Sequence, residues 1–79
     1  MSTLDVKPEP LAIEARCTDA ALCVILADGR EISVPLAWFP RLLRAKPAQR
    51  ANFRLIGGGI GIHWPDVDED VSVESILAT

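Results

Sequence analysis

Two short stretches contain the residue types that most often perform chemistry. His63 is the only histidine, and it lies close to Asp66 and Asp68, so a metal site is one interpretation. One histidine does not supply the three protein ligands that a catalytic zinc site usually has, and the acidic residues lack the spacing of a calcium loop. We therefore expect no metal and no cofactor. We expect the acidic segment, residues 66–70, to be a loop, and we expect His63 to hydrogen-bond it as a structural residue.

Residues 57–61, Gly-Gly-Gly-Ile-Gly, look like a phosphate-binding loop. A Walker-type loop needs Gly-Lys-Ser/Thr leading into a helix, and a dinucleotide fingerprint also opens a helix. Here residues 60–64 follow, in which large apolar side chains alternate with Gly61 and His63, as in a strand. We predict a hairpin turn, in which the glycines favour a bulge or a close approach of another backbone segment, with a neighbouring chain as one source. Because no serine or cysteine lies at a recognisable spacing from a base, we predict that the protein is not an enzyme.

The two cysteines, Cys17 and Cys23, do not form a motif. We expect them on neighbouring strands of a tight hairpin with their side chains on opposite faces, where they cannot form a disulfide. Two cysteines without further ligands also make a poor metal site. We interpret them as small, buried apolar residues.

Charge is separated along the chain, although the net charge is only −3. Residues 32–65 contain no acidic residue and five basic ones: Arg41, Arg44, Lys46, Arg50 and Arg54. The acidic residues that follow are Asp66, Asp68, Glu69, Asp70 and Glu74. In one interpretation the two groups pair across the surface, each exposed pair contributing about 0–1 kcal/mol. In the other they form a bipolar docking surface, because charge asymmetry steers association.

The element that must position these charges is a predicted helix over residues 37–45. Arg41 and Arg44 fall on its outer face. Pro40 is tolerated in the first turn, and Pro47 ends the helix. We expect five large apolar residues to be structural core: Trp38, Phe39, Leu42, Leu43 and Trp64.

Strands are predicted on both sides of this helix. Residues 11–18 alternate, with Ile13 on the buried face; residues 21–27 are apolar at both parities, as in a central strand; and residues 30–36 alternate again. Asp28-Gly29 predicts the hairpin between the last two. After the helix we predict a single turn that begins at Pro47, a hairpin of residues 53–56 and 60–64, and a terminal helix, residues 73–78, capped by Ser72.

The predicted fold is therefore α+β in two layers: a three-stranded antiparallel meander, one main helix, a β-hairpin and a short C-terminal helix. We expect a flexible N-terminal arm at residues 1–10 and one domain over residues 11–79. The 79 residues are 49% apolar, without a run long enough for a membrane span. We see no signal-peptide pattern and expect a cytoplasmic protein. So small a chain is marginally stable alone, which makes self-association plausible.

The sequence also resembles the bacterial domain-of-unknown-function family 2442 over almost its whole length. The resemblance rests on five stretches: residues 28–30, Asp-Gly-Arg; residues 34–42, with Trp-Phe-Pro-Arg-Leu; residues 50–52, Arg-Ala-Asn; residues 57–65, with Ile-His-Trp-Pro; and residues 68–74, with Asp-Glu-Asp. It implies a small α+β fold without established catalytic activity. Because members are often encoded beside another small protein in a toxin–antitoxin-like arrangement, it also implies a protein partner.

We predict a non-catalytic protein-interaction module, antitoxin-like, that binds a small protein partner, itself, or both. Partner-binding residues are expected on the helix face and the acidic segment: Arg41, Arg44, His63, Asp66, Asp68, Glu69 and Asp70. The alternative is a regulatory module that contacts nucleic acid directly or through a DNA-binding partner. Direct contact is disfavoured by the acidic total and by the lack of aromatics among the arginines. The third hypothesis is a small enzyme or metal-binding protein that uses His63.

Overall fold

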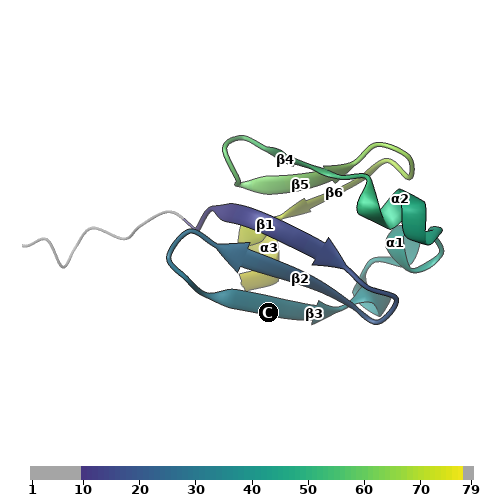
Figure 1. The fold of residues 1–79 in the computed structure, drawn as a ribbon, viewed down its shortest axis with the longest axis horizontal. Coiled ribbons are helices and arrows are strands. Elements are labelled where there is room, and N and C mark those ends of the chain that lie inside the picture. The colour runs from purple at the N-terminus through teal and green to yellow at the C-terminus, as the bar shows by residue number, and fades with distance from the viewer. Residues whose placement is uncertain (1–9, 78–79) are drawn as a thin grey trace, which may run out of the picture.

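The computed structural model describes residues 10–77. The predicted arm, apart from Pro10, lies outside these residues. The fold is α+β, as predicted, with two three-stranded antiparallel sheets and short helices (Figure 1). The elements are β1 (Ala12–Cys17), β2 (Ala21–Leu26), β3 (Glu31–Pro35), the 3-10 helix η2 (Leu36–Trp38), α1 (Pro40–Leu43), α2 (Pro47–Ala51), β4 (Arg54–Ile56), β5 (Gly61–Trp64), β6 (Glu69–Ser72) and α3 (Val73–Leu77).

The first sheet is the predicted meander, in the order β1-β2-β3. On the central strand β2, one face is fully buried and carries Leu22, Val24 and Leu26, whereas the other face is half-buried. The β2–β3 turn forms at Asp28-Gly29, because Gly29 adopts a φ of 95°. The Asp28 carboxylate accepts the Arg30 backbone N–H at 3.0 Å, and this hydrogen bond lowers the pKa of Asp28.

One prediction for this sheet is wrong. Ile13 was expected on the buried face of β1, but it is 61% exposed. The pairing with β2 shifts by one residue between Ala12 and Glu14, which marks a β-bulge. Because an extra residue reverses the face on which the following side chains lie, Ala12 and Ala15 are both buried and Ile13 turns outward.

The predicted single helix is also wrong, because it is broken at Phe39. This residue has a φ of −125° and a ψ of 83° and separates η2 from α1. Proline disfavours the α region for the residue before it, so Pro40 can begin a helix only if Phe39 leaves one. Trp38 therefore precedes the break and is 51% exposed instead of in the core. In the four-residue α1, Leu42 is buried and Leu43 is 44% exposed.

The predicted second hairpin is a three-stranded sheet, in the order β4-β5-β6. The acidic segment was expected to be a loop, but Glu69 and Asp70 begin β6, where they pair with Trp64 and His63. Asp68, in the turn before them, has a φ of 51°. Aspartate tolerates this left-handed conformation better than most residues do, so the strand can return directly along β5.

The two sheets meet where β1 begins. The Ala12 N–H donates to the Gly59 carbonyl at 2.7 Å, and a Cβ on Gly59 would lie 2.4 Å from the Ala12 carbonyl oxygen. A close backbone approach was predicted for these glycines, with a neighbouring chain as one source. The strand that approaches is β1 of the same chain.

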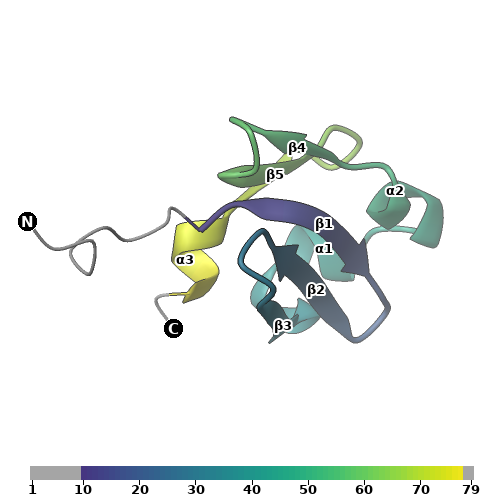
Figure 2. The same cartoon turned by 60° about the vertical axis from the view of Figure 1, so that its left-hand side comes forward.

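The core lies between the sheets and is closed by the short helices. Its largest fully buried side chains are Trp64, Leu22, Leu26, Leu36, Leu42 and Ile62. As predicted, Ser72 caps α3: its hydroxyl accepts the Ser75 N–H at 3.1 Å. Figure 2 shows α3 beside the start of β1, at the end of the molecule opposite α2. Among residues 10–77, no helix is long and apolar enough to cross a membrane.

Candidate protein-binding surface

The segment from η2 to the start of α2 presents large apolar and basic side chains to solvent. Trp38 and Leu43 are 51% and 44% exposed, and Arg41, Arg44 and Lys46 are exposed between and after them. We call these five residues the Trp38 surface. Tryptophan and arginine are among the residue types that contribute most energy at protein interfaces. Sequence analysis assigned Trp38 and Leu43 to the core, and the Phe39-Pro40 step was the signal against that assignment.

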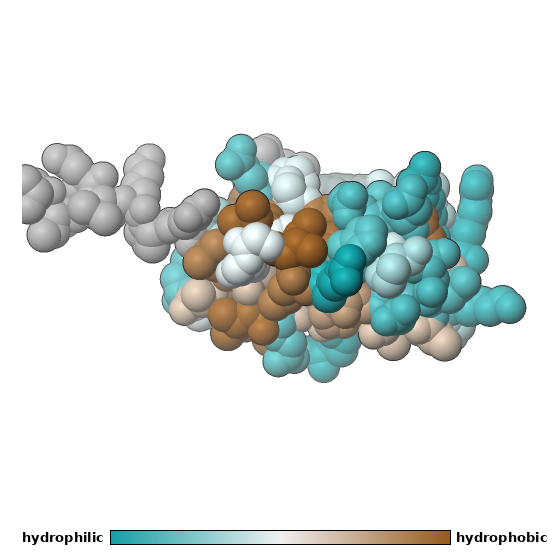
Figure 3. Space-filling view, turned by 90° about the horizontal axis from the view of Figure 1, so that it is seen from above, coloured by the Kyte–Doolittle hydropathy of each residue, from teal (hydrophilic) through white to brown (hydrophobic). Residues whose placement is uncertain are grey.

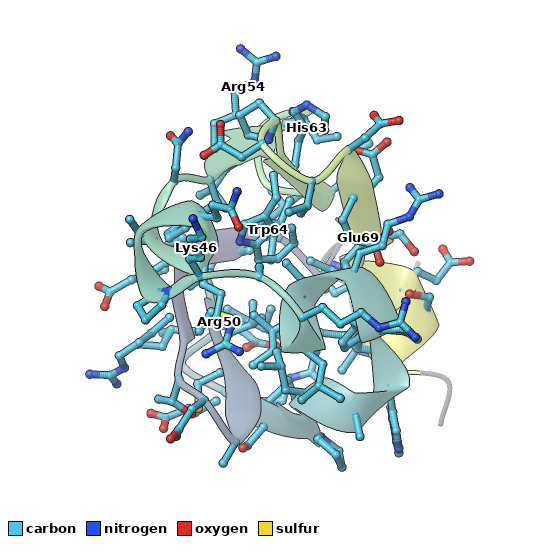
Figure 4. The ribbon with its side chains drawn as sticks, turned by 90° about the vertical axis from the view of Figure 1, so that its right-hand side faces the viewer. Lys46, Arg50, Arg54, His63, Trp64 and Glu69 are labelled. Atoms are coloured by element: carbon cyan, nitrogen blue, oxygen red, sulfur yellow. The ribbon has the colours of Figure 1, made fainter. Side chains whose placement is uncertain are left out.

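Arg50 is half-buried and its side chain is hydrogen-bonded to the fold. Its Nε and Nη2 donate to the carbonyls of Leu42 and Leu43, both at 2.8 Å, and so satisfy the C-terminal end of α1. The Arg50 carbonyl accepts the indole N–H of Trp64 at 3.0 Å. Figure 4 shows Trp64 inside the ribbon, with Arg50 and Lys46 on the same side of it. Arg50 thus joins α2 to the end of α1 and to Trp64 in β5.

The acidic segment reaches the Trp38 surface at one point. Arg41 Nη1 donates to the backbone carbonyl of Asp68 at 2.6 Å, so α1 and the β5–β6 turn are in contact. Asn52 Nδ2 donates to the Asp66 carboxylate at 3.0 Å. Within residues 10–77, however, the pair between an arginine or lysine and a carboxylate is Arg30–Asp28, and Asp70 is hydrogen-bonded to His63. Neither contact joins one of the five basic residues of the middle stretch to the acidic segment. Pairing of the two charged groups is therefore absent from this part of the chain.

His63 is hydrogen-bonded to the acidic segment, as predicted. Its Nδ1 lies 2.5 Å from the Asp70 carboxylate, across the β5–β6 pair. Arg54 is its neighbour on the other side, in β4, and points away from the protein in Figure 4. The residues that the structure describes include no group of three His, Cys, Asp or Glu side chains placed to hold a metal. His63 and Asp70 form a cross-strand polar pair on the second sheet, separate in sequence and element from Arg44.

The cysteines lie as predicted on neighbouring strands with opposite facing. Cys17 packs against the core, whereas the Cys23 thiol lies 3.7 Å from the Ser33 hydroxyl on the other face of the sheet. Both are free. Burial raises the pKa of the Cys17 thiol, which disfavours the thiolate that nucleophilic chemistry needs.

A second apolar patch, which we call the isoleucine patch, lies elsewhere on the molecule. It comprises Ile13 at the β1 bulge and Ile56 and Ile60 on either side of the β4–β5 turn, all exposed. Figure 3 shows apolar side chains gathered over this turn and the start of β1. The patch lacks the aromatic and arginine residues that characterise energetically important interface positions.

Comparisons with known proteins fit this combination of fold and residues. The family model described as "Protein of unknown function (DUF2442)" matches residues 12–79. The chain belongs to the DUF2442 family. A crystal structure of a protein of unknown function from Rhodospirillum rubrum ATCC 11170, at 2.75 Å resolution, is similar. It has a TM-score of 0.78 and 30% sequence identity over 90% of this chain and 88% of that chain. No functionally curated protein matches the sequence.

Membership of DUF2442 confirms the resemblance stated from the motifs and accounts for the α+β fold. The Trp-Phe-Pro-Arg-Leu motif that contributed to the resemblance is the stretch that contains Trp38 and Arg41. The family description assigns no activity. Function therefore has to be argued from the surface of this DUF2442 protein.

Proposed function

We propose that this DUF2442 protein acts without catalysis, by binding a small partner protein through the Trp38 surface in an antitoxin-like arrangement. The observation that carries the proposal is the exposure of two large apolar side chains, Trp38 in η2 and Leu43 in the α1 helix that follows it. Burial of apolar area stabilises an interface by about 25 cal/mol per Å². Covering these two side chains would thus give a partner an apolar centre, and Arg41 and Arg44 would form a polar rim.

The acidic segment supports the same surface from one side. The Arg41–Asp68 hydrogen bond fixes the β5–β6 turn beside α1. An interface centred on Trp38 would therefore meet cations and carboxylates at its edge, and a partner with a complementary charge pattern would be favoured. His63 and Asp70 lie in the second sheet and do not take part in this proposal.

The test compares two double variants of the tagged full-length protein. Trp38→Ala/Leu43→Ala truncates the proposed anchors, whereas Ile13→Ala/Ile60→Ala truncates two similarly exposed residues of the isoleucine patch. Each protein is used to capture partners from a nuclease-treated native lysate, and the captured proteins are identified by mass spectrometry. We expect one small protein in stoichiometric amount with the wild type and the control. It should be missing with Trp38→Ala/Leu43→Ala, because anchor truncation typically costs about 2 kcal/mol or more.

Equal recovery by both double variants would reject the Trp38 surface. The purified partner then allows calorimetry with each variant, which separates loss of affinity from loss of fold. Circular dichroism of both variants checks that the loss of capture is not caused by unfolding.

A second candidate function is a regulatory module that contacts nucleic acid directly or through a DNA-binding partner. It is favoured by Arg44, Lys46 and Arg54, which are exposed and form no ion pair within residues 10–77. Direct binding would cause retention on immobilised DNA that falls steeply with salt. A partner recovered only from lysate without nuclease would also favour this function over the first.

A further inference from the structure

We infer that the partner offers the Trp38 surface a short acidic segment that also contains an apolar side chain. The inference rests on the proposed function and specifies the chemistry of its partner. Four of the eight basic residues of the protein, and none of its eleven acidic residues, lie in residues 36–51. The rest of the chain is strongly acidic. The helical region of residues 36–51, which we call the basic end, is therefore the part of the molecule that a negatively charged partner can approach.

The hydrogen bonds show which of these cations are available. Arg50 is half-buried and uses its guanidinium on the carbonyls of Leu42 and Leu43. Arg41 gives one donor to the Asp68 carbonyl. The Arg44 side chain is exposed and makes no hydrogen bond or ion pair within residues 10–77, and Lys46 forms no ion pair there. Arg44 therefore keeps a complete guanidinium for a ligand.

A free guanidinium fits a carboxylate best, since both are planar and can form two parallel hydrogen bonds. Leu43 precedes Arg44 directly, and both are exposed. A peptide segment that binds the Arg44 guanidinium is therefore within reach of Leu43 and can cover it with an apolar side chain. Trp38 supplies a second apolar contact on the same segment. Acidic and apolar side chains in one segment satisfy both features together.

A long polyanion fits this end less well. Asp68 lies against Arg41, and Asp66 is held nearby by Asn52. A phosphodiester backbone needs a continuous basic track and would run into these carboxylates after a few contacts. A short acidic segment can end before it reaches them. We therefore assign the surface to an acidic peptide segment of a protein.

The test uses a random peptide display library as the probe, with the full-length protein as bait. Peptides that bind the wild type are sequenced, synthesised and titrated by fluorescence polarisation. Two charge reversals are compared: Arg44→Glu in the Trp38 surface and Arg16→Glu on the exposed face of β1. Both change the net charge equally, so a general charge effect acts on both. Trp38→Ala reports whether the peptides bind at the proposed surface.

We expect selected peptides to be enriched in Asp and Glu around at least one apolar residue. Their affinity should fall about tenfold or more for Arg44→Glu, because the reversed charge repels the carboxylate it would otherwise bind. Affinity should fall for Trp38→Ala and stay within about twofold for Arg16→Glu, which lies outside the interface.

Three results would overturn the inference. The first is selection of neutral or basic peptides whose binding is lost in Trp38→Ala, which would reject an acidic partner but leave the proposed function intact. Acidic peptides that bind Arg44→Glu or Trp38→Ala as tightly as wild type would place the acidic contact elsewhere. A dimer in sedimentation that Arg44→Glu dissociates, together with no selected peptides, would assign the surface to a second copy of the chain. Failure of the proposed function itself would be shown by a different experiment, the lysate capture, if both double variants recovered the partner equally.

Discussion

The two tryptophans have opposite environments. Trp64, on β5, is fully buried, contacts Phe53 at a ring-centroid distance of 6.1 Å and donates its indole N–H to the Arg50 carbonyl. Trp38, on η2, is half-exposed, and the side chain of Arg44, which follows α1, makes no hydrogen bond or ion pair within residues 10–77. The same residue types therefore stabilise the fold in one region and are available for binding in the other.

The hydrogen bonds of an arginine side chain therefore say more about its role than its charge does. The Arg50 guanidinium donates to the C-terminal carbonyls of α1, so it is not available to bind a ligand. The Arg44 side chain makes no hydrogen bond or ion pair within residues 10–77. Both residues carry the same charge, but the Arg50 guanidinium is hydrogen-bonded within residues 10–77, whereas the Arg44 guanidinium is exposed and unpaired there.

The largest expected contrast is in stability. Trp64→Ala should lower the free energy of unfolding by about 3–5 kcal/mol, because it leaves a large cavity and an unsatisfied Arg50 carbonyl. Trp38→Ala should change it by no more than about 0.5 kcal/mol, as is usual for exposed sites. Urea denaturation followed by circular dichroism measures both values.

In a chain of 79 residues, Trp64→Ala can abolish folding. Trp64→Phe keeps most of the ring and removes only the indole N–H, so its expected cost is about 1–3 kcal/mol. Similar losses for Trp64→Phe and Trp38→Phe would contradict the division into a structural and an exposed tryptophan.

The next contrast concerns the two arginines. Arg50→Ala removes two hydrogen bonds from a charged donor to the end of α1, and we expect a loss of about 1–3 kcal/mol. Arg44→Ala should be within about 0.5 kcal/mol of the wild type. Thermal unfolding of both variants at equal protein concentration decides the point. If Arg44→Ala is the more destabilising, Arg44 has a structural role and the inference about an acidic partner loses its basis.

Much of the fold could be predicted because its patterns are local. Alternation places β2 and β3, Asp28-Gly29 gives the hairpin, and Ser72 gives the cap of α3. Two errors came from single residues that interrupt a period. The bulge at Ile13 reverses the face of β1, and Phe39 leaves the helix ahead of Pro40. The apolar residues on both sides of Phe39 keep helical spacing, so this pattern alone did not predict the break.

The site was harder to predict, because it depends on contacts between distant residues. Arg50 and Trp64 are joined by a hydrogen bond that no sequence period encodes. The pair His63–Asp70 was expected in general form, yet the strand β6 that aligns it was not, since acidic residues are depleted in strands. Arg41 and Arg44 were named from their helix face. Trp38, which now defines the surface, was assigned to the core.

The smallest expected contrast, and the most direct, is optical. Trp64→Phe leaves Trp38 as the only tryptophan, and Trp38→Phe leaves Trp64. Acrylamide should quench Trp38 emission several-fold more strongly than Trp64 emission in the native proteins, because quenching requires contact with the exposed ring. In urea the two variants should become equal, which controls for differences between the fluorophores. Adding a peptide selected on the wild-type bait should then protect Trp38 and leave Trp64 unchanged. Equal native quenching would mean that Trp38 is covered in solution, and the surface would have to be sought at the isoleucine patch instead.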